Sequence, residues 1–327
     1  MITDRLDLSL EVSTALAEGR PVVALESTLI SHGLPYPQNL DVATASESAV
    51  RAAGAVPATV AINGGRLLVG LDPAALRALA TAPAGSVRKA ARPSLAAAIA
   101  DGGWAATTVS ATMIAAHAAG IRVFATGGIG GVHRGALGSG GAPGNRDGGT
   151  ATATAPALPT FDISSDLEEL GRTPMAVACA GPKAILDVPA TLEYLETRGV
   201  PVVAVGQPDL PGFFARSAGL AAPASVPDVV GAATIVRTHL GLGLGGGILI
   251  CVPVPAAEAL PEDVARAAVE RAIGDATAAG IGGPALTPWL LARIAVLTDG
   301  ASVRANTALI VTDARVAGEL AVLLAAG

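Results

Sequence analysis

The chain has 327 residues and a formal net charge of −6. Its basic residues do not cluster, which argues against a nucleic-acid-binding protein. Apolar residues make up 51% of the chain but aromatic residues only 2%, so Val, Leu, Ile and Ala must build the core, as in parallel strands covered by helices. Residues 1–12 lack the features of a signal peptide, and glycines and prolines interrupt the longest uncharged stretch, 240–257. We therefore expect a cytoplasmic protein with no membrane partner.

Three segments share one order: a helix, a glycine and a strand. They are AAGAVPATVAI, AAGIRVFATG and TRGVPVVAVG. This recurrence predicts an α/β fold with a mainly parallel sheet. In chain order, periodicity and turn residues predict strands at 21–25, 56–62, 66–69, 121–125, 175–179, 200–205 and 248–252, and helices at 40–53, 72–80, 107–120, 183–197, 229–240, 261–279, 286–297 and 301–325.

Glu26 follows the first predicted strand and opens a loop rich in hydroxyl groups, glycine and proline, STLISHGLPYPQN. The carboxyl end of a strand is where open α/β sheets bind ligands. We therefore predict that Glu26 is a general acid or base. The alternative is a carboxylate that caps a nearby backbone.

Lys89 stands in a short basic stretch with Arg88 and Arg92. Three cations within five residues indicate an anion site, for which a phosphate is the expected ligand, and a solvated basic loop is the alternative. Further on, the hydroxyl groups of TTVSAT, residues 107–112, fit either an anion cradle or the capping of a helix.

The glycine-rich run TGGIGGVHRG, residues 126–135, follows another predicted strand. It differs from G-x-G-x-x-G, and no acidic residue is placed to bind a ribose, so we do not predict a dinucleotide site. The glycines instead let backbone amides approach a ligand, with His133 and Arg134 as polar contacts. A structural histidine is the alternative for His133.

Residues 137–159 are of low complexity and predict a flexible surface insertion. Asp162 and Asp166 follow, with two serines between them. Oxygen ligands at this spacing suit Mg²⁺ or Mn²⁺, whereas capping of a helix over DLEEL explains the same residues. Farther along, Cys179 and Cys251 lie in apolar runs, which is typical of buried, reduced thiols rather than of a catalytic cysteine.

Lys183 carries the strongest chemical signal, because 19 of the 21 basic residues are arginine and only Lys89 and Lys183 are lysine. An amine, unlike a guanidinium group, can lose its proton when desolvated and attack a carbonyl carbon. Drift in composition is the alternative. Since Pro182 suits a first helical turn, we expect Lys183 at the start of a helix over 183–197, where the helix dipole would help to keep its amine neutral.

Several long motifs, in the same order over nearly the whole chain, resemble the pseudouridine-5'-phosphate glycosidase family. They are ALESTLISHGLPYPQN, TTVSATM, ATGGIGGVHRG, FDISSDL, CAGPKAILDVPATLEYLETRGVPVV, LTPWLL and RANTAL. The resemblance implies a single three-layer α/β/α domain over 1–327, a homotrimer and a divalent metal, typically Mn²⁺. It also implies reversible hydrolysis of the C–C glycosidic bond of pseudouridine 5'-phosphate to uracil and ribose 5-phosphate.

The same resemblance assigns roles to individual residues. Lys183 falls on the nucleophile that forms a Schiff base with C1' of the ring-opened sugar, Glu26 on the proton donor and Asp162 on the metal ligand. The positions expected to contact the substrate are Lys89, Val109, Thr126, His133, Ser164, Ser165, Asp166 and Asn306.

Two departures from the family pattern bear on substrate choice. The family commonly has S-R-R-D-L after its first lysine, whereas residues 91–95 here read A-R-P-S-L, and the insertion separates His133 from Asp162. Two alternatives to the glycosidase follow. One is a relative that forms a C-ribosyl bond to another acceptor, and the other is a phosphosugar-binding protein with little turnover.

Overall fold

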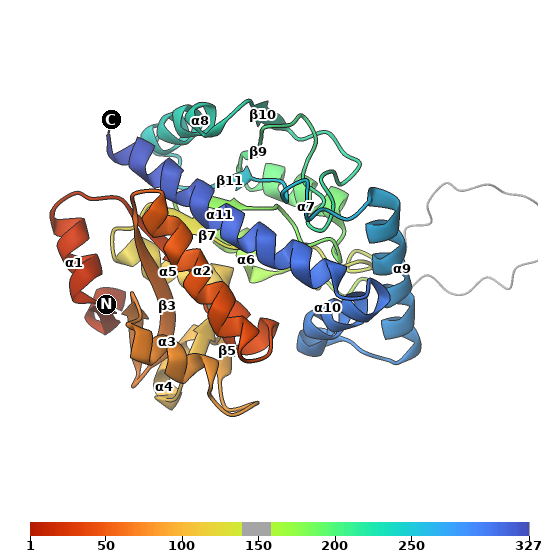
Figure 1. Ribbon diagram of the computed structural model, residues 1–327, viewed down its shortest axis with the longest axis horizontal. Coiled ribbons are helices and arrows are strands. Elements are labelled where there is room, and N and C mark those ends of the chain that lie inside the picture. Colours follow the sequence, from red (N-terminus) through yellow and green to blue (C-terminus); the bar gives the residue numbers. More distant parts are fainter. Residues whose placement is uncertain (139–157, 327) are drawn as a thin grey trace, which may run out of the picture.

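The computed structural model describes residues 1–138 and 158–326, and has helices on both faces of a central sheet (Figure 1). The strands are β1 (Leu6–Leu8), β2 (Val22–Leu25), β3 (Val56–Asn63), β4 (Arg66–Val69), β5 (Arg88–Ala90), β6 (Ala105–Thr107), β7 (Val123–Ala125), β8 (Ala176–Cys179), β9 (Val202–Val205), β10 (Ala224–Val226) and β11 (Ile248–Cys251). The helices are α1 (Leu10–Ala17), α2 (Gln38–Ala52), α3 (Pro73–Ala80), α4 (Leu95–Asp101), α5 (Val109–Ala118), α6 (Ser165–Leu170), α7 (Val188–Thr197), α8 (Val229–Gly241), α9 (Glu262–Ala278), α10 (Leu286–Leu297) and α11 (Ala301–Ala325).

The sheet is mixed but mainly parallel, in the order β1-β4-β3-β2-β7-β8-β11-β9-β10, with β6 beside β3 and β5 beside β6. Among the strands of residues 1–138 and 158–326, only the pairs β3–β4 and β3–β6 are antiparallel. Each of the three predicted helix–glycine–strand units is present, and its glycine has a positive φ: 91° at Gly54, 88° at Gly120 and 69° at Gly199. A residue without Cβ adopts this conformation readily. The predicted α/β fold is confirmed.

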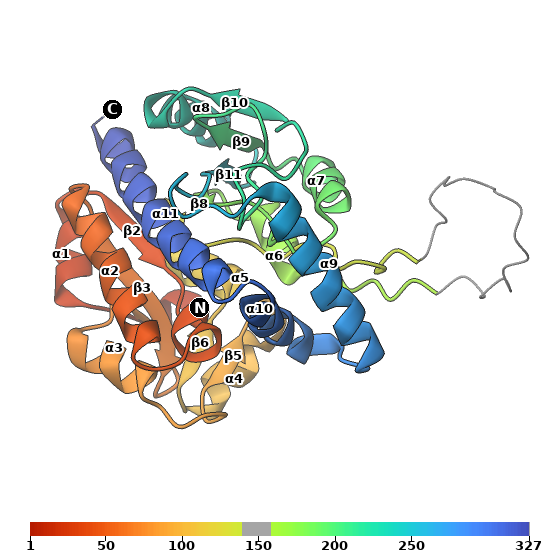
Figure 2. The ribbon, with the colours of Figure 1, turned by 45° about the vertical axis from the view of Figure 1, so that its right-hand side comes forward.

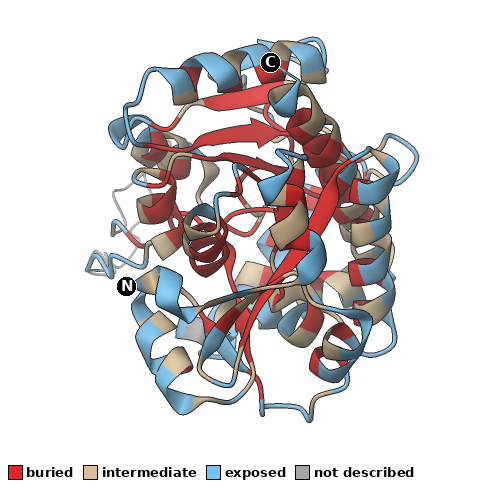
Figure 3. Ribbon diagram, turned by 90° about the vertical axis from the view of Figure 1, so that its left-hand side faces the viewer, coloured by how far each residue is buried: buried red, intermediate tan, exposed pale blue. Residues whose placement is uncertain are grey.

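The strands at the centre of the sheet are buried on both faces (Figure 3). One face packs against α2, α8 and α11, and the other against α1, α5, α6 and α7. Helices α2 and α11 lie side by side (Figures 1 and 2). They approach closely at Gly318, where an added Cβ would be 2.6 Å from the Cβ of Ala53. Such small residues let Ala-rich helices cover the aliphatic strands that the composition predicts.

One local prediction is wrong. Helix α7 begins at Val188, with the Asp187 side chain accepting the amide of Ala190 as N-cap, so Lys183 precedes the helix in a turn. The argument from the helix dipole therefore does not apply to its amine. Lys89, for which a solvated basic loop is the alternative to an anion site, lies in the short strand β5.

The low-complexity segment predicted at 137–159 lies almost entirely outside the described residues. Among the helices that the structure does describe, none combines the length and apolar character needed to cross a membrane.

Candidate active site

Glu26 and Lys183 meet at one edge of the sheet because the strands before them are parallel neighbours of β7. Leu25 of β2 pairs with Ala125 of β7, which pairs in turn with Ala178 of β8. The three parallel strands end at the same edge of the sheet, so the residues that follow them lie close together. Here the hydroxyl group of Thr126 donates a hydrogen bond to Oε1 of Glu26. The Lys183 amide donates to the carbonyl of Ile129 at 3.2 Å, which fixes the turn that carries the amine.

The charged groups at this edge, Glu26, Lys89 and Lys183, shift the pKa values of Glu26 and Lys89. Burial raises the pKa of Glu26, although the nearby Lys183 ammonium group and the Thr126 hydroxyl group act in the opposite direction. Desolvation lowers the pKa of Lys89, and repulsion from Lys183 lowers it further. The structure thus brings both lysines close to a carboxyl group that favours its protonated form. This is the arrangement that a proton donor beside an amine nucleophile requires.

Of the three clustered cations, two are held by carboxylates. Arg88 forms an ion pair with Asp101, and both side chains are about half exposed. Arg92 forms an ion pair with Glu169, which is only 2% exposed. Lys89 is the member of the cluster whose pKa is influenced by Lys183 and Glu26.

Asp166 joins two loops at the edge of the site. Its Oδ1 accepts the Ser110 amide and its Oδ2 accepts the Gly130 amide, both at 3.0 Å. The side chain is 6% exposed. In this structure the carboxylate therefore orients the start of α5 and the glycine-rich run, and both of its oxygens are occupied by backbone amides. Sequence reasoning assigned it a direct substrate contact but missed this connecting role.

The two serines before Asp166 support the same connection. The Ser164 side chain caps α6 by accepting the Asp166 amide, as the capping alternative predicted. The hydroxyl group of Ser165 lies 3.2 Å from that of Ser110.

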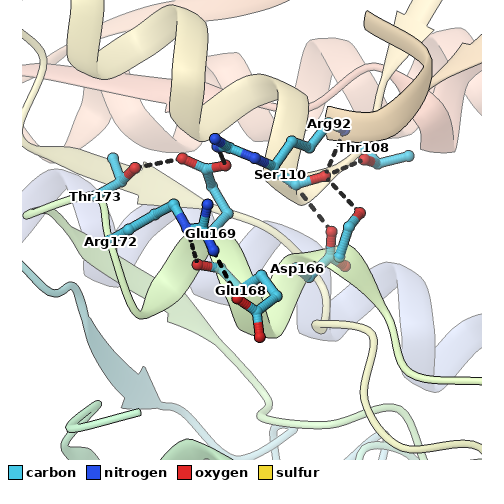
Figure 4. A network of polar contacts seen from close by, with 9 residues as sticks. Arg92, Thr108, Ser110, Asp166, Glu168, Glu169, Arg172 and Thr173 are labelled. Carbon is cyan, nitrogen blue, oxygen red and sulfur yellow. Dashed lines mark hydrogen bonds and ion pairs between the residues drawn. The ribbon is translucent and has the colours of Figure 1, made fainter. Parts of the chain in front are cut away.

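Arg92 joins this polar network to Glu169 of α6 (Figure 4). Its amide donates to the Ser110 hydroxyl group at 3.1 Å, while its guanidinium group reaches Glu169 of α6. Glu169 also accepts a hydrogen bond from Thr173. Residues 91–95 depart from the family pattern but still form an ordered turn. Ser94, where the family commonly has an aspartate, accepts the Ala91 amide.

Asp162, the predicted metal ligand, is exposed, and its backbone carbonyl accepts the His133 amide at 3.0 Å. No three His, Cys, Asp or Glu side chains in the described part of the chain form a ready-made metal cage. Magnesium and similar ions are usually held by one or two carboxylates together with water and substrate phosphate, so a single exposed carboxylate fits an ion of this class. Asp166 already accepts one backbone amide on each carboxylate oxygen.

The other predicted contacts surround the same loops. Val109 is the first residue of α5, and its side chain is buried, so only its backbone can face a ligand. Asn306 of α11 lies over the glycine-rich run, because a Cβ added to Gly127 would be 3.6 Å from its Oδ1. His133 is partly buried at the far end of this run.

A cavity of about 540 Å³ adjoins the Lys183 turn through Pro182 and Ala184. Arg134, Asp187 and Arg266 also line it, whereas Glu26, Lys89 and Lys183 do not. The site of the reactive groups is therefore at the strand ends, beside this cavity rather than within it.

The chain matches the model of the family described as indigoidine synthase A like protein over residues 11–323. It is 52% identical to the pseudouridine-5'-phosphate glycosidase of Paracoccus denitrificans, over 97% of this chain and 98% of the relative. It is 50% identical to the enzyme of the same name from Caldanaerobacter subterraneus, over 98% of this chain and 96% of that relative.

Two solved structures share the fold. The prealnumycin C-glycosynthase AlnA, in complex with ribulose 5-phosphate, superposes with a TM-score of 0.84 at 38% identity, over 98% of this chain and 97% of that one. An indigoidine synthase A-like protein from Thermotoga maritima gives 0.81 at 28% identity, over 98% and 96%. The relationship expected from the motifs is confirmed: the chain belongs to the indigoidine synthase A-like family, with the pseudouridine-5'-phosphate glycosidases as its relatives.

Proposed function

We propose that this enzyme reversibly hydrolyses the C–C glycosidic bond of pseudouridine 5'-phosphate to uracil and ribose 5-phosphate. The observation that carries the proposal is the position of Glu26, whose pKa is raised, beside the only two lysines of the chain. Relatives about half identical to this chain carry the name of this activity.

The chemistry explains why an amine is needed. The bond joins C1' to a carbon of uracil, so protonation of a leaving oxygen, as in common glycosidases, is insufficient. As Glu26 donates a proton to the ring oxygen, the C1'–O4' bond opens and Nζ of Lys183 bonds to C1'. The new ammonium group loses its extra proton to solvent, and C5 of uracil gains a proton from solvent. The C1'–C5 bond then breaks, its electrons restore the C5–C6 double bond, and the nitrogen lone pair forms the iminium ion. Water then releases the sugar from Lys183.

The remaining residues bind and orient the substrate in this proposal. Lys89 and the backbone amide at the start of α5 supply positive potential for the phosphate. Thr126, His133 and Asn306 contact the sugar, and Asp166 orients the loops on either side. Asp162 would hold Mn²⁺, with water and phosphate oxygens completing its coordination. Such an ion supplies charge stabilisation to the bound phosphosugar.

The first experiment measures uracil release from pseudouridine 5'-phosphate by the purified protein, with Mn²⁺ and after chelation. We expect turnover that chelation abolishes. Release that survives chelation, or that is unchanged in Asp162→Asn, would contradict the metal assignment.

The nucleophile is tested by trapping. Sodium borohydride should reduce the iminium ion and attach ribose 5-phosphate to the wild-type protein, and Lys183→Ala should abolish this labelling. Lys89→Ala serves as the matched control, since it should weaken binding but leave an amine at position 183. Labelling that persists in Lys183→Ala would overturn the assignment.

A second candidate is the formation of a C-ribosyl bond to another acceptor. It is favoured by the 38% identity to AlnA, whose name is that of a C-glycosynthase. A folded protein that traps ribose 5-phosphate on Lys183 but releases no uracil would support this candidate. Failure to trap the sugar at all would favour a phosphosugar-binding protein. The resemblance also supports a cytoplasmic homotrimer, which sedimentation of the purified protein tests for oligomeric state.

A further inference from the structure

A small cavity lies behind Glu26, on the face of the sheet that α2 and α11 cover. Its volume is about 10 Å³, and its polar lining comes from Glu26, Thr126, Thr59 and Ser46. A space of this size holds about one water molecule, and a buried water is stable where it has two or more polar partners. At about 10 Å³ the cavity reaches the lower limit for one water, and four polar residues contribute to its lining.

Thr59 connects this cavity to a second carboxyl group. It pairs with Leu25, the residue directly before Glu26, and is 2% exposed. Its hydroxyl group donates to Oε1 of Glu47 on α2 at 2.5 Å. Glu47 is partly exposed. The charged groups that act on its pKa are Arg51 and Glu11, which form an ion pair with each other at the surface. Polar groups thus lead from the surface of α2 to the back of Glu26.

Both carboxyl groups on this route hold a proton more readily than an exposed glutamate. Burial raises the pKa of Glu26 and that of Glu47, and the Thr59 hydrogen bond and Arg51 only partly oppose this effect on Glu47. A substrate bound against Glu26 and Lys183 would separate Glu26 from solvent on the open side. The route through Thr59 approaches from the opposite side.

We propose that Glu47, the Thr59 hydroxyl group and one water in this cavity form a relay that returns a proton to Glu26. Before the transfer, the Thr59 hydroxyl group turns to donate to the water, and protonated Glu47 donates to Oγ1 of Thr59, the reverse of the hydrogen bond described above. Glu47 then gives its proton to Oγ1 of Thr59, the hydroxyl proton passes to the water, and the water gives a proton to the Glu26 carboxylate. Glu47 then takes a proton from solvent, so every group regains its initial state. The relay rests on the proposed role of Glu26 as proton donor.

A crystal structure tests the route without any assumption about activity. We expect an ordered water in hydrogen-bond contact with both the Glu26 carboxyl group and Oγ1 of Thr59. A dry cavity, or a water that contacts only one of the two, would overturn the relay.

Three variants test the proton transfer. Thr59→Val removes the hydroxyl group and keeps the shape of the side chain, Thr59→Ser restores the hydroxyl group, and Glu47→Gln keeps an acceptor for Thr59 but cannot supply a proton. We expect kcat to fall roughly tenfold in Thr59→Val and Glu47→Gln, a part of the usual contribution of acid–base catalysis. KM should change little, and the solvent deuterium isotope effect on kcat should increase. Thr59→Ser should resemble the wild type.

The competing explanation is that Thr59 only ties α2 to the sheet. In that case Thr59→Val would lower the melting temperature without changing the isotope effect, and Glu47→Gln would keep the wild-type kcat. That result would overturn the relay and leave the proposed function intact. A wild-type protein that releases no uracil would instead contradict the proposed function, and the crystallographic water would then decide whether the route exists.

Discussion

The carboxyl group of Glu26 lies in an environment that favours its neutral form. It accepts a hydrogen bond from Thr126, and the positive charges of Lys183 and Lys89 only partly offset the effect of burial. A buried carboxyl group of this kind is the usual means by which an enzyme keeps an acid protonated near neutral pH. The same environment has a measurable effect on folding.

Glu26→Gln should stabilise the protein at neutral and higher pH. Because the pKa of Glu26 is raised in the folded state, the folded protein binds more protons than the unfolded chain above about pH 4.5, and its stability falls as the pH rises. The gain should grow as the pH rises toward 8 and should vanish below about pH 4.5. Calorimetric melting curves across this range measure it. Glu258→Gln, at an exposed carboxylate, is the control, and equal pH slopes for wild type and Glu26→Gln would contradict the prediction.

Three residues that the structure brings together at the strand ends gave a signal in the sequence. Lys183 and Lys89 were identified by scarcity, and Glu26 by its place after a strand. Glu47 and Thr59 gave no such signal, because a glutamate on an amphipathic helix and a threonine in a strand are ordinary residues. Their relation to Glu26 depends on the pairing of β2 with β3 and on the packing of α2, which sequence periodicity does not specify.

The short elements around Lys89 depend on one another. Strand β5 is three residues long, and the 3-10 turn that follows it, Arg92–Ser94, is joined to α6 through the ion pair of Arg92 with Glu169. Short segments of this kind have little stability of their own. We therefore expect the ion pair to affect both the fold and the position of Lys89.

Arg92→Ala and Arg88→Ala form a matched pair of variants. Removal of Arg92 leaves the buried Glu169 carboxylate without its cation and should cost about 1–3 kcal/mol, since partial exposure of Arg92 reduces the full effect. Removal of Arg88 breaks an exposed pair and should cost at most about 0.5 kcal/mol. Urea denaturation measures both, and equal losses would show that the network does not depend on burial.

The glycine-rich run needs its glycines for close approach. A Cβ at Gly130 would be 2.2 Å from Oγ of Ser164 and 2.9 Å from Oδ2 of Asp166. Gly130→Ala should therefore displace the carboxylate that accepts its own amide, destabilise the fold by about 1–3 kcal/mol and reduce activity. Gly103→Ala, where no atom lies within 4 Å of the added Cβ, is the control. Melting temperature and uracil release distinguish the two variants, and a Gly130→Ala protein that behaves like Gly103→Ala would contradict this account.

Elements with strong periodicity were predicted to within a few residues, and weak ones were not. The start of α7 was placed too early because Pro182, Ile185 and Leu186 imitate a helical turn, whereas Asp187 and Pro189 are the actual start signals. Ile185 and Leu186 are instead buried in the core as part of a turn. Strands β5 and β6 have three residues each, too few to show a period of two.

At the scale of the whole molecule, α11 runs across the sheet and packs against both α2 and α8. Helix α11 carries a fully buried acid, Asp313. Neither carboxyl oxygen of Asp313 has a hydrogen-bond partner among the described residues. Burial raises the pKa of Asp313 well above its ordinary value. An unsatisfied polar group at this position opposes folding.

Asp313→Leu should stabilise the protein by about 1–3 kcal/mol, because an apolar side chain of similar size removes the desolvation penalty. The difference should increase as the pH rises above about 3.8, where the unfolded chain ionises but the folded protein resists ionisation. Asp41→Leu, at an exposed acid of α2, should change stability by less than about 0.5 kcal/mol. Thermal melting at two pH values measures both. A destabilised Asp313→Leu protein would show that the carboxyl group has a partner in solution.

The proximity of Lys89 and Lys183, the only lysines of the chain, has a consequence for chemical labelling. An acylating reagent that attacks amines can react with side chains at these two positions only, besides the α-amino group of Met1. A bound phosphosugar should shield both from the reagent. Digestion with a protease that cuts only after lysine then reports the result, because the unmodified chain yields the pieces 1–89, 90–183 and 184–327. A sugar fixed to Lys183 leaves 90–327 in one piece.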